Sequence, residues 1–272
     1  MPQSHSKSKT PNASGQKAVV IGAGIIGVNV ALALQDKGYQ VTILDRGEPG
    51  MGASFGNAGG IAVTECAPIA MPGTLMNVPG WLLDPLGPLS VRWGYLPNML
   101  PWLVRFLAAS SKSRVEQIAT ELAALLNRAW DDYDPVIAKA GLADAVFKKE
   151  GAMAVYRSDA SRRKDDYAID LRRRNGIKIR DLTRAEVRDL EPDLAPIFSC
   201  GVMEEDWGRV LDPYKILMGL YKCFLDQGGK FETAEVTDFV YRDGKPRAAM
   251  TTSGDQITFD TVVVACGAWS KT

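Results

Sequence analysis

Residues 19–27 read Val-Val-Ile-Gly-Ala-Gly-Ile-Ile-Gly, a glycine spacing typical of the turn between a strand and a helix. In this pattern Gly22 permits the tight turn, Gly24 lets backbone approach a ligand, and Gly27 lets helix and strand pack closely. The N–H groups of the first helical turn then face a bound phosphate, with the positive end of the helix dipole behind them. The pattern predicts a dinucleotide-binding βαβ unit.

The segments around this turn support the prediction. Residues 17–21 read as a strand, and residues 25–34 as an apolar helix that Gly38 can end. Residues 40–45 then form a second strand that finishes at Asp45. A carboxylate there can accept hydrogen bonds from a ribose, which favours an unphosphorylated adenine dinucleotide over NADP. The alternative is an ordinary βαβ unit whose glycines serve only packing, and it is disfavoured because all context requirements are met together.

Composition narrows the class of protein. Of 272 residues 46% are hydrophobic, enough for a sizeable core, and Lys plus Arg equal Asp plus Glu at 32 each. This balance provides no net field that would recruit nucleic acid or an anionic membrane. The only histidine, His5, lies in a polar tail, which excludes a catalytic histidine or a histidine metal ligand. Four scattered cysteines without a CxxC motif favour reduced thiols in a soluble, cytoplasmic protein over disulfides or a metal site.

A second glycine-rich stretch follows the first. Residues 47–60 contain six glycines together with Ser54 and Asn57. Such a loop can bring backbone N–H groups and two side-chain donors against a ligand; on composition alone it could also be a flexible surface loop.

The run Gly-Ala-Ser-Phe-Gly-Asn-Ala-Gly-Gly at 52–60 resembles a segment of the FAD-dependent D-amino acid oxidase and dehydrogenase family. The closest likeness is to bacterial D-amino acid dehydrogenase small subunits. In that family the run passes the FAD pyrophosphate and reaches the flavin ring. The resemblance therefore implies that Ser54 lies near the phosphates and that residues 57–60 lie near the isoalloxazine.

Further matches lie downstream. Residues 190–192, Leu-Glu-Pro, resemble the family's Glu-Pro turn, and residues 208–213 resemble its Gly-x-x-x-Asp-Pro segment. Independently of the resemblance, Asp212 suits a helix N-cap and Pro213 the first turn of a helix over 214–227.

The last part of the chain supplies two more elements. Residues 233–239 predict a strand, where the family places a valine backbone against the adenine; Val236 is the candidate. Residues 261–270 resemble the family's second dinucleotide signature. Their β-branched run predicts a parallel strand buried on both faces, broken at Gly267 where backbone can again approach the cofactor.

The resemblance implies an α/β protein with a Rossmann-like FAD-binding domain and an inserted α+β substrate domain. We place a disordered tail at 1–16, the two parts of the FAD-binding domain at 17–66 and 208–272, and the cap and substrate domain at 67–207. No metal site is expected. The implied FAD-binding residues are Ile21, Gly22, Ala23, Gly24, Ile25, Ile26, Gly27, Asp45, Arg46, Ser54, Asn57, Ala58, Gly59, Gly60, Val236, Ala265 and Gly267.

The middle of the chain differs from the rest in composition. In residues 67–110 seven prolines interleave with Trp81, Trp93 and Trp102, which predicts loops and short helices. Two interpretations stay open. The segment is a hydrophobic cap over the substrate cavity, or an interfacial patch that docks on a membrane or a partner.

Periodicity predicts the remaining elements. We expect a strand at 151–157 and a charged helix at 159–174, whose end, Arg172–Arg174, is solvated. Residues 114–142 predict mostly helix, with core packing at Ile118, Leu122, Leu125 and Leu126.

The activity that the resemblance implies is oxidative deamination of D-amino acids. A hydride passes from the α-carbon to FAD, and the imino acid hydrolyses to a 2-oxo acid and ammonia. The chemistry is the cofactor's, and the sequence identifies no catalytic residue. Related dehydrogenases pass electrons to the respiratory chain, so a respiratory acceptor and a peripheral place on the inner membrane are compatible with it. Near rivals are oxidation of glycine, sarcosine or D-hydroxyproline.

Members of the family generally run well beyond 272 residues. They continue with the rest of the substrate sheet, a last glycine-rich segment and the arginine that grips the substrate carboxylate. We therefore expect both domains to be incomplete here; Arg92, Arg105 and Arg157 are substitutes that nothing in the sequence elevates. A hypothesis of another class is an inactive fragment or a nucleotide-binding module. A third is an NAD-dependent reductase.

Overall fold

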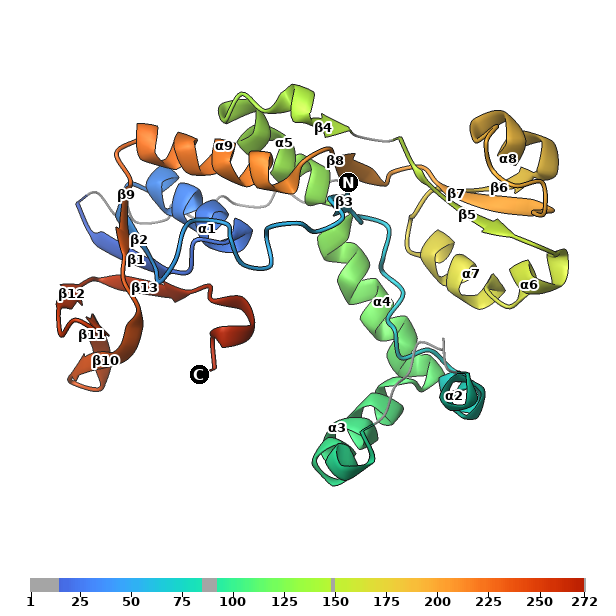
Figure 1. Cartoon of the computed structure of the whole chain (residues 1–272), viewed down its shortest axis with the longest axis horizontal. Helices are drawn as coiled ribbons and strands as arrows, with labels where there is room; N and C mark the ends of the chain where they lie inside the picture. Colours follow the sequence, from blue (N-terminus) through green and yellow to red (C-terminus); the bar gives the residue numbers. More distant parts are fainter. Residues whose placement is uncertain (1–14, 85–91, 148–149, 272) are drawn as a thin grey trace, which may run out of the picture. The chain divides into compact units, whose positions relative to one another are not determined.

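The computed structural model describes residues 15–84, 92–147 and 150–271 and divides into two compact units (Figure 1). The two units are described separately below. The first unit comprises residues 1–59, 134–145 and 210–272, and the second comprises residues 60–133 and 146–209.

A parallel sheet forms the centre of the first unit. Its strand order is β13 (Thr261–Val264), β1 (Lys17–Ile21), β2 (Gln40–Asp45) and β9 (Lys230–Thr233). The strands predicted at 17–21 and 40–45 are confirmed to the residue. The buried side chains of both strands explain why these segments read as apolar runs.

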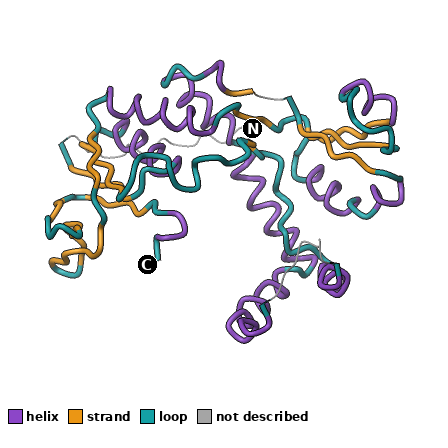
Figure 2. Tube along the Cα trace, viewed as in Figure 1, coloured by secondary structure: helices purple, strands orange, loops and turns teal. Residues whose placement is uncertain are grey.

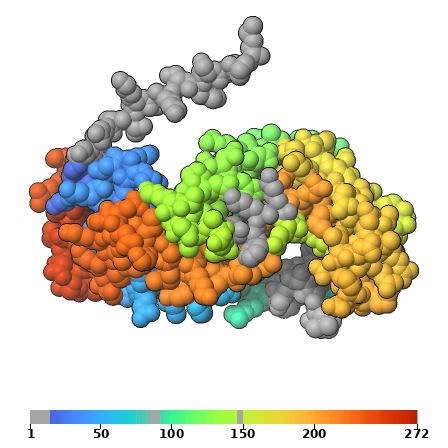
Figure 3. Space-filling view, turned by 90° about the horizontal axis from the view of Figure 1, so that it is seen from above, coloured from blue at the N-terminus to red at the C-terminus, as the bar shows by residue number. Residues whose placement is uncertain are grey.

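Two helices cover this sheet and pack on each other. Helix α1 (Ile25–Asp36) runs two residues past the predicted end, and Gly38 adopts the left-handed φ of 89° that lets the chain turn back. Helix α9 (Pro213–Asp226) buries Leu217, Leu220 and Phe224. In the space-filling view the blue N-terminal segment lies against the orange segment that contains α9 (Figure 3).

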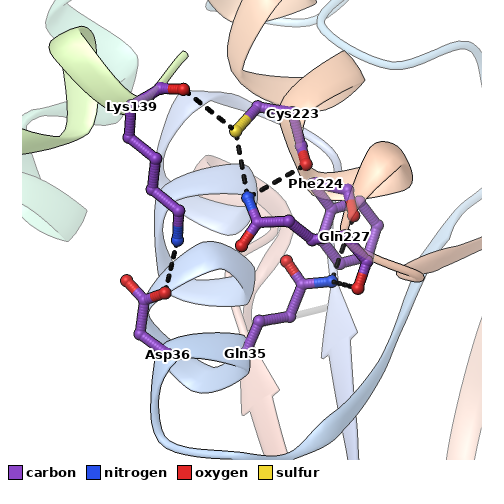
Figure 4. A network of polar contacts seen from close by, with 6 residues as sticks. All are labelled: Gln35, Asp36, Lys139, Cys223, Phe224 and Gln227. Carbon is purple, nitrogen blue, oxygen red and sulfur yellow. Dashed lines mark hydrogen bonds and ion pairs between the residues drawn. The ribbon is translucent and has the colours of Figure 1, made fainter.

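Polar contacts tie the ends of these helices together (Figure 4). Gln35 donates to the carbonyl of Phe224 at 3.0 Å. Lys139, the last residue of α5 (Ala129–Lys139), pairs with Asp36, and Gln227 donates to Sγ of Cys223 at 3.0 Å. The 3-10 turn η2 (Ala143–Ala145) follows α5.

An antiparallel sheet of β10 (Val236–Arg242), β11 (Lys245–Thr251) and β12 (Gln256–Thr258) completes the unit (Figure 2). The single strand predicted at 233–239 is wrong, because the chain changes sheets there. The N–H of Ala234 still donates to Asp45 O at 2.8 Å, whereas Glu235 O accepts from Thr252 of the antiparallel sheet at 2.9 Å.

The predicted burial of the last strand on both faces is also wrong. Strand β13 lies at the edge of the described sheet, where only β1 pairs with it. Three of its residues are half-buried and Val264 is 44% exposed. The 3-10 turn η3 (Gly267–Trp269) follows.

The second unit contains an antiparallel sheet in the order β5 (Ala152–Tyr156), β7 (Cys200–Glu204), β6 (Ile179–Thr183). A smaller sheet joins β3 (Gly60–Ile61), β8 (Gly208–Val210) and β4 (Val146–Phe147). The strand predicted at 151–157 is confirmed as β5.

The charged helix predicted at 159–174 is two helices, α6 (Asp159–Arg163) and α7 (Asp166–Arg174). A capping box between Ser158 and Ser161 starts α6, and Asp165 leaves helical geometry with φ −96° and ψ 1°. Helix α8 (Arg184–Leu190) begins with a second capping box, Thr183 with Glu186.

Helices dominate the rest of this unit: α2 (Thr74–Leu83), η1 (Trp93–Tyr95), α3 (Leu96–Ala109) and α4 (Lys112–Leu126). The predicted loops and short helices are confirmed for α2 and η1, but α3 extends to 14 residues. Pro97 occupies its first turn, where no N–H is needed, and the helix continues through Pro101.

The helix predicted over 114–142 breaks between α4 and α5. Of its predicted core residues, Leu122 and Leu126 pack against a buried cluster, whereas Leu125 does not. Helix α4 buries the small side chains Val115, Ala119 and Ala123, while Leu125 is 74% exposed. Small residues occupy the buried face of α4 because this helix packs closely against Leu171 of α7. Over the described residues, no helix is long and apolar enough to cross a bilayer.

Candidate functional site

The carboxyl ends of three neighbouring parallel strands gather most of the predicted site. Strands β1, β2 and β13 end at Ile21, Asp45 and Val264, and their next residues share one edge of the sheet. In open α/β sheets this edge is where ligands bind. All predicted site residues except Gly60, which lies in β3 of the second unit, belong to the first unit.

Two glycines of the β1–α1 turn are required by packing. Gly22 has a left-handed φ of 109°, and a Cβ there would collide with the carbonyl of Ala265. A Cβ on Gly27, in the first turn of α1, would collide with the carbonyl oxygen of Gly22. A side chain at Gly22 would displace the residues after β13, and one at Gly27 would push α1 away from the turn.

The reason for a glycine differs at position 24, where close packing does not require one but a side chain would fill the space in front of the turn. The only atom that a Cβ there would meet within 4 Å is Oγ of Ser54, at 3.3 Å. Gly24 is the N-cap of α1 and has no side chain to cap the helix. Buried Ser54 accepts a hydrogen bond from the N–H of Ile25 at 2.9 Å, while Ile26 is 66% exposed. The start of α1 therefore presents backbone donors beside an open surface, as a phosphate site requires.

Asp45 holds this turn in shape. Its Oδ2 accepts from the N–H of Ala23 at 2.7 Å, and its Oδ1 accepts from the N–H of Gly47 at 3.0 Å. Each carboxylate oxygen can accept a second hydrogen bond, so the group can hold the backbone and still receive ribose hydroxyls. The residues present fit the ADP half of a dinucleotide.

The loop after β2 uses its polar side chains internally. Asn57 donates to Ser54 O at 3.2 Å and accepts from the N–H of Gly59 at 2.9 Å. Its amide thus helps to fold the loop, and the bond to Ser54 O uses one of the two hydrogens on its Nδ2. Ala58 is exposed, and a Cβ on Gly59 would lie 2.6 Å from Val210 O.

The residues after β13 close the same edge. Ala265 donates its N–H to Ile21 O at 2.7 Å, and the Cys266 thiol lies 3.3 Å from the same oxygen. Burial, followed by the Asp45 carboxylate, raises the pKa of Cys266, so it is a neutral donor here. Gly267 has a left-handed φ of 56° with open space where a Cβ would lie. Val236, at the start of β10, packs against the core around Val19.

Arg46 makes two contacts that the sequence did not predict. Its guanidinium carbon lies 5.3 Å from the ring centroid of Trp269, and Nη1 lies 3.6 Å from Oε1 of Glu235. These residues come from three separate segments beside the Asp45 end of β2. The only signal in the sequence was the aromatic residue Trp269 within the second signature, residues 261–270.

Arg172 corrects the prediction of a solvated helix end. Its side chain is only 15% exposed; Nη2 lies 2.5 Å from Oε2 of Glu65, and Nε lies 3.6 Å from Oε1 of Glu204. Thr64, fully buried, donates its hydroxyl to Glu204. Burial raises the pKa of Glu204, although Thr64 and Arg172 act against it.

Metal-ligating side chains do not cluster in the described part of the chain. No group of three or more His, Cys, Asp or Glu side chains in the described ranges could hold a metal ion. In the hollow beside α6 and α7 both lining arginines are paired, because Arg162 and Arg173 each contact Asp181 at 2.6 Å. Arg92, Arg105 and Arg157 are exposed.

Comparisons with known proteins show the family of this chain. The model of the DAO family, described as FAD dependent oxidoreductase, matches residues 17–272. D-amino-acid oxidase of Bradyrhizobium diazoefficiens is 38% identical over 94% of this chain and 61% of its own length. D-amino acid dehydrogenase 2 of Ralstonia nicotianae is 31% identical over 91% of this chain and 59% of its own length.

Solved structures share the fold. Glycine oxidase of Geobacillus kaustophilus has a TM-score of 0.63 at 19% identity, covering 94% of this chain and 56% of that one. L-amino acid deaminase of Proteus vulgaris has the same TM-score at 18% identity, covering 98% and 50%. The chain spans about three fifths of the length of the curated relatives it matches. By its match over residues 17–272, the chain belongs to the DAO family of FAD-dependent oxidoreductases.

Proposed function

We propose that this chain binds the ADP half of FAD at the β1–α1 turn and serves flavin-dependent oxidative deamination of D-amino acids. The observation that carries the proposal is the turn itself. Asp45 and Ser54 hold its backbone from both sides, and Gly24 leaves the space in front of it open. Relatives named as D-amino-acid oxidase and D-amino acid dehydrogenase support the substrate class.

The chain's own residues bind and orient the cofactor in this proposal. The N–H groups at the start of α1 and the helix dipole stabilise the pyrophosphate charge. Asp45 accepts from the adenosine ribose, and Gly24 admits the phosphates to backbone contact. Residues 57–60 and Gly267 approach the cofactor further along, and Val236 approaches its adenine. When bound, FAD supplies the acceptor for the hydride of the substrate amine.

The domain division belongs to the same proposal. Residues 17–66 and 208–272 form the two parts of the FAD-binding domain, and residues 67–207 contribute the cap and substrate domain. We also propose a cytoplasmic protein, at most peripheral on the inner membrane, that passes electrons to a respiratory acceptor. Its four cysteines are free, as expected of a reducing compartment.

The direct test separates cofactor binding from turnover. The purified chain is examined for a flavin absorption spectrum, and D-alanine or D-proline is then added without oxygen. Retained flavin that bleaches with the D-amino acid supports the whole proposal. Flavin that stays oxidised with every D-amino acid tested contradicts the activity but not the cofactor site. A protein that is protected by NAD and retains no flavin contradicts both.

A single substitution tests the site itself. In Gly24→Ala the new Cβ meets only the Ser54 hydroxyl, at 3.3 Å, which a shift of a few tenths of an ångström relieves. The melting temperature of the apoprotein should therefore change little, and its measurement detects any loss of the Ser54 contact to Ile25. The same methyl group would occupy the proposed approach of the pyrophosphate, and we expect FAD affinity to fall by about tenfold or more, the equivalent of about 1.4 kcal/mol. Gly94→Ala is the control, because its Cβ would meet nothing within 4 Å. Equal FAD affinity in both variants would place the pyrophosphate elsewhere.

A further inference from the structure

Residues 265–269, which follow β13, lie across the carboxyl edge of the parallel sheet. The sheet order places β1 between β13 and β2. Ala265 donates its N–H to the carbonyl of Ile21, the last residue of β1, at 2.7 Å. Four residues later, the guanidinium carbon of Arg46 lies over the Trp269 indole, 5.3 Å from the ring centroid. Arg46 is the first residue after β2, so the segment passes the end of β1 and reaches the end of β2.

Two segments that are distant in the chain hold the Arg46 side chain. Trp269 contacts it through the indole, and Oε1 of Glu235 lies 3.6 Å from its Nη1. The side chains of Arg46 and Glu235 are about half exposed, and so is Trp269. Exposed cation–π contacts and exposed ion pairs contribute little to the free energy of folding. The main effect of these contacts is therefore to restrict the rotamers of a long, flexible side chain.

The restricted guanidinium lies where the proposed cofactor site receives adenosine. Asp45, the residue before Arg46, is the proposed acceptor for the ribose, and Val236, the residue after Glu235, is the proposed contact of the adenine. The base is bonded to the ribose, so a side chain held between Asp45 and Glu235 is within its reach. Nucleic acid bases stack on guanidinium planes as they do on aromatic rings. An arginine ordered at this place therefore suits an adenine.

We propose that Trp269 is a positioning residue of the cofactor site, which holds the Arg46 guanidinium in place for the adenine of FAD. The inference rests on the proposed function, because it takes the β1–α1 turn as the site of the ADP half. Trp269 acts on the cofactor only through Arg46. Ordering the guanidinium before binding reduces the entropy that is lost when the complex forms, and this raises the affinity.

Titration calorimetry of the full chain, freed of flavin, with FAD and with ADP tests the proposal. ADP contains the adenine, the ribose and two phosphates but no flavin, so a contact at the adenosine should affect both ligands equally. Ordering one long side chain only on binding costs about fivefold in affinity, which is the loss expected for Trp269→Leu. Trp269→Phe keeps an aromatic ring beside Arg46 and should bind within about twofold of the parent.

Trp102→Leu is the matched control. Its indole is 57% exposed, against 51% for Trp269, and it also has a ring contact, with Phe106 at 5.1 Å between centroids. Trp102 belongs to the second unit and Trp269 to the first. The control should leave the affinities for FAD and ADP unchanged. Equal losses in Trp102→Leu and Trp269→Leu would overturn the proposal, because they would not depend on Arg46.

A double-mutant cycle shows whether Trp269 acts through Arg46. Arg46→Gln removes the stacking group and should weaken ADP binding by about tenfold. If the indole only holds that group, Arg46→Gln/Trp269→Leu should bind ADP as Arg46→Gln does, whereas independent effects would multiply to about fiftyfold. Multiplied effects would mean that the indole contacts the cofactor itself, and the proposal would be wrong.

The remaining outcomes separate this inference from the proposed function. A parent chain that binds neither FAD nor ADP contradicts the cofactor site and the inference with it. A parent that binds both, while Trp269→Leu binds them equally well, contradicts the inference alone. A loss of affinity for FAD but not for ADP would put the role of Trp269 at the flavin and would also contradict it. If circular dichroism shows that Trp269→Leu is unfolded, Arg46→Lys, which keeps the charge without the planar group, replaces it; ADP affinity equal to that of the parent then overturns the proposal.

Discussion

The β1–α1 turn and the cluster around Arg172 are both built on buried polar contacts, but they arise differently. At the turn, Asp45 and Ser54 accept from backbone N–H groups of residues 23 and 25, and the fit depends on glycines that have no side chain. Around Arg172, a helix, a loop and a strand each contribute a charged or hydroxyl side chain.

This difference teaches which contacts a sequence reveals. At the turn, steric crowding allows only glycine at certain positions. The requirement is therefore visible in the sequence as glycines at a fixed spacing. The ion pairs of Arg172 admit many arrangements, because any carboxylate brought near by the fold can serve. Four predictions below test this contrast, from the largest expected effect to the smallest.

Gly27→Ala should be the most damaging change. Its Cβ collides with the backbone carbonyl of Gly22, which cannot move without separating α1 from β1. We expect a loss of about 4 kcal/mol in the free energy of unfolding, measured by urea denaturation. Gly52→Ala is the control, since its Cβ meets nothing within 4 Å, and should change stability by less than about 1 kcal/mol. Similar losses in both variants would mean that the collision with Gly22 is not what destabilises Gly27→Ala.

Arg172→Gln should come next. It leaves Glu204 buried beside Thr64 without its cation, and breaking a buried pair in this way costs about 3 kcal/mol. Arg174→Gln is the matched control two residues later, where a half-exposed guanidinium contacts Glu116 at 3.4 Å. Exposed pairs of that kind contribute about 0.5 kcal/mol. If thermal unfolding shows the same loss of stability in Arg172→Gln and Arg174→Gln, Arg172 is as exposed to solvent as we predicted from the sequence.

The same contrast explains how far the sequence could predict this molecule. Strands β1 and β2, helix α1 and the Asp212 cap follow from short-range periodicity and capping rules, and their bounds are correct within two residues. The change of sheets at Ala234 and Glu235 leaves no local signal, because both segments favour β-structure.

Within the candidate site, contacts made by loop residues could not be predicted either. Asp45 could be predicted because the end of β2 has a fixed place beside the turn. The internal use of the Asn57 amide and the stacking of Arg46 on Trp269 depend on loop conformation, which composition does not determine. Leu125 was predicted to lie in the core because its spacing suits the apolar face of a helix. In the structure α4 buries its alanines instead, and Leu125 is exposed.

Asp212→Ala measures a contact that was predictable from local rules. Its Oδ1 accepts from the N–H groups of Tyr214 and Lys215 at 3.0 and 3.1 Å, and loss of such a cap costs about 1 kcal/mol. Ser111, the N-cap of α4, has no side-chain cap hydrogen bond, so Ser111→Ala should have a much smaller effect. Chemical denaturation compares the two. Equal losses would mean that occupying the N-cap position matters more than the hydrogen bonds seen at Asp212.

The smallest effect is a pH dependence with opposite sign at two glutamates. Burial raises the pKa of Glu204, whereas the Thr183 backbone and hydroxyl hold the pKa of Glu186 below its ordinary 4.5. A raised carboxyl pKa contributes stability that is complete below 4.5 and is lost as pH rises through the folded-state value. A lowered one contributes stability that is present above 4.5 and is lost as pH falls through the folded-state value.

The Gln variants isolate these two contributions, because each keeps an oxygen acceptor and removes the titration. The stability of the parent relative to Glu204→Gln should therefore decrease as the pH rises above 4.5, while its stability relative to Glu186→Gln should decrease as the pH falls below 4.5. Urea midpoints at closely spaced pH values give both curves. If the stability difference between the parent and Glu204→Gln instead increases with pH, the attraction of Arg172 for the Glu204 carboxylate outweighs the cost of its burial. Ion pairing would then stabilise this cluster as steric fit stabilises the β1–α1 turn.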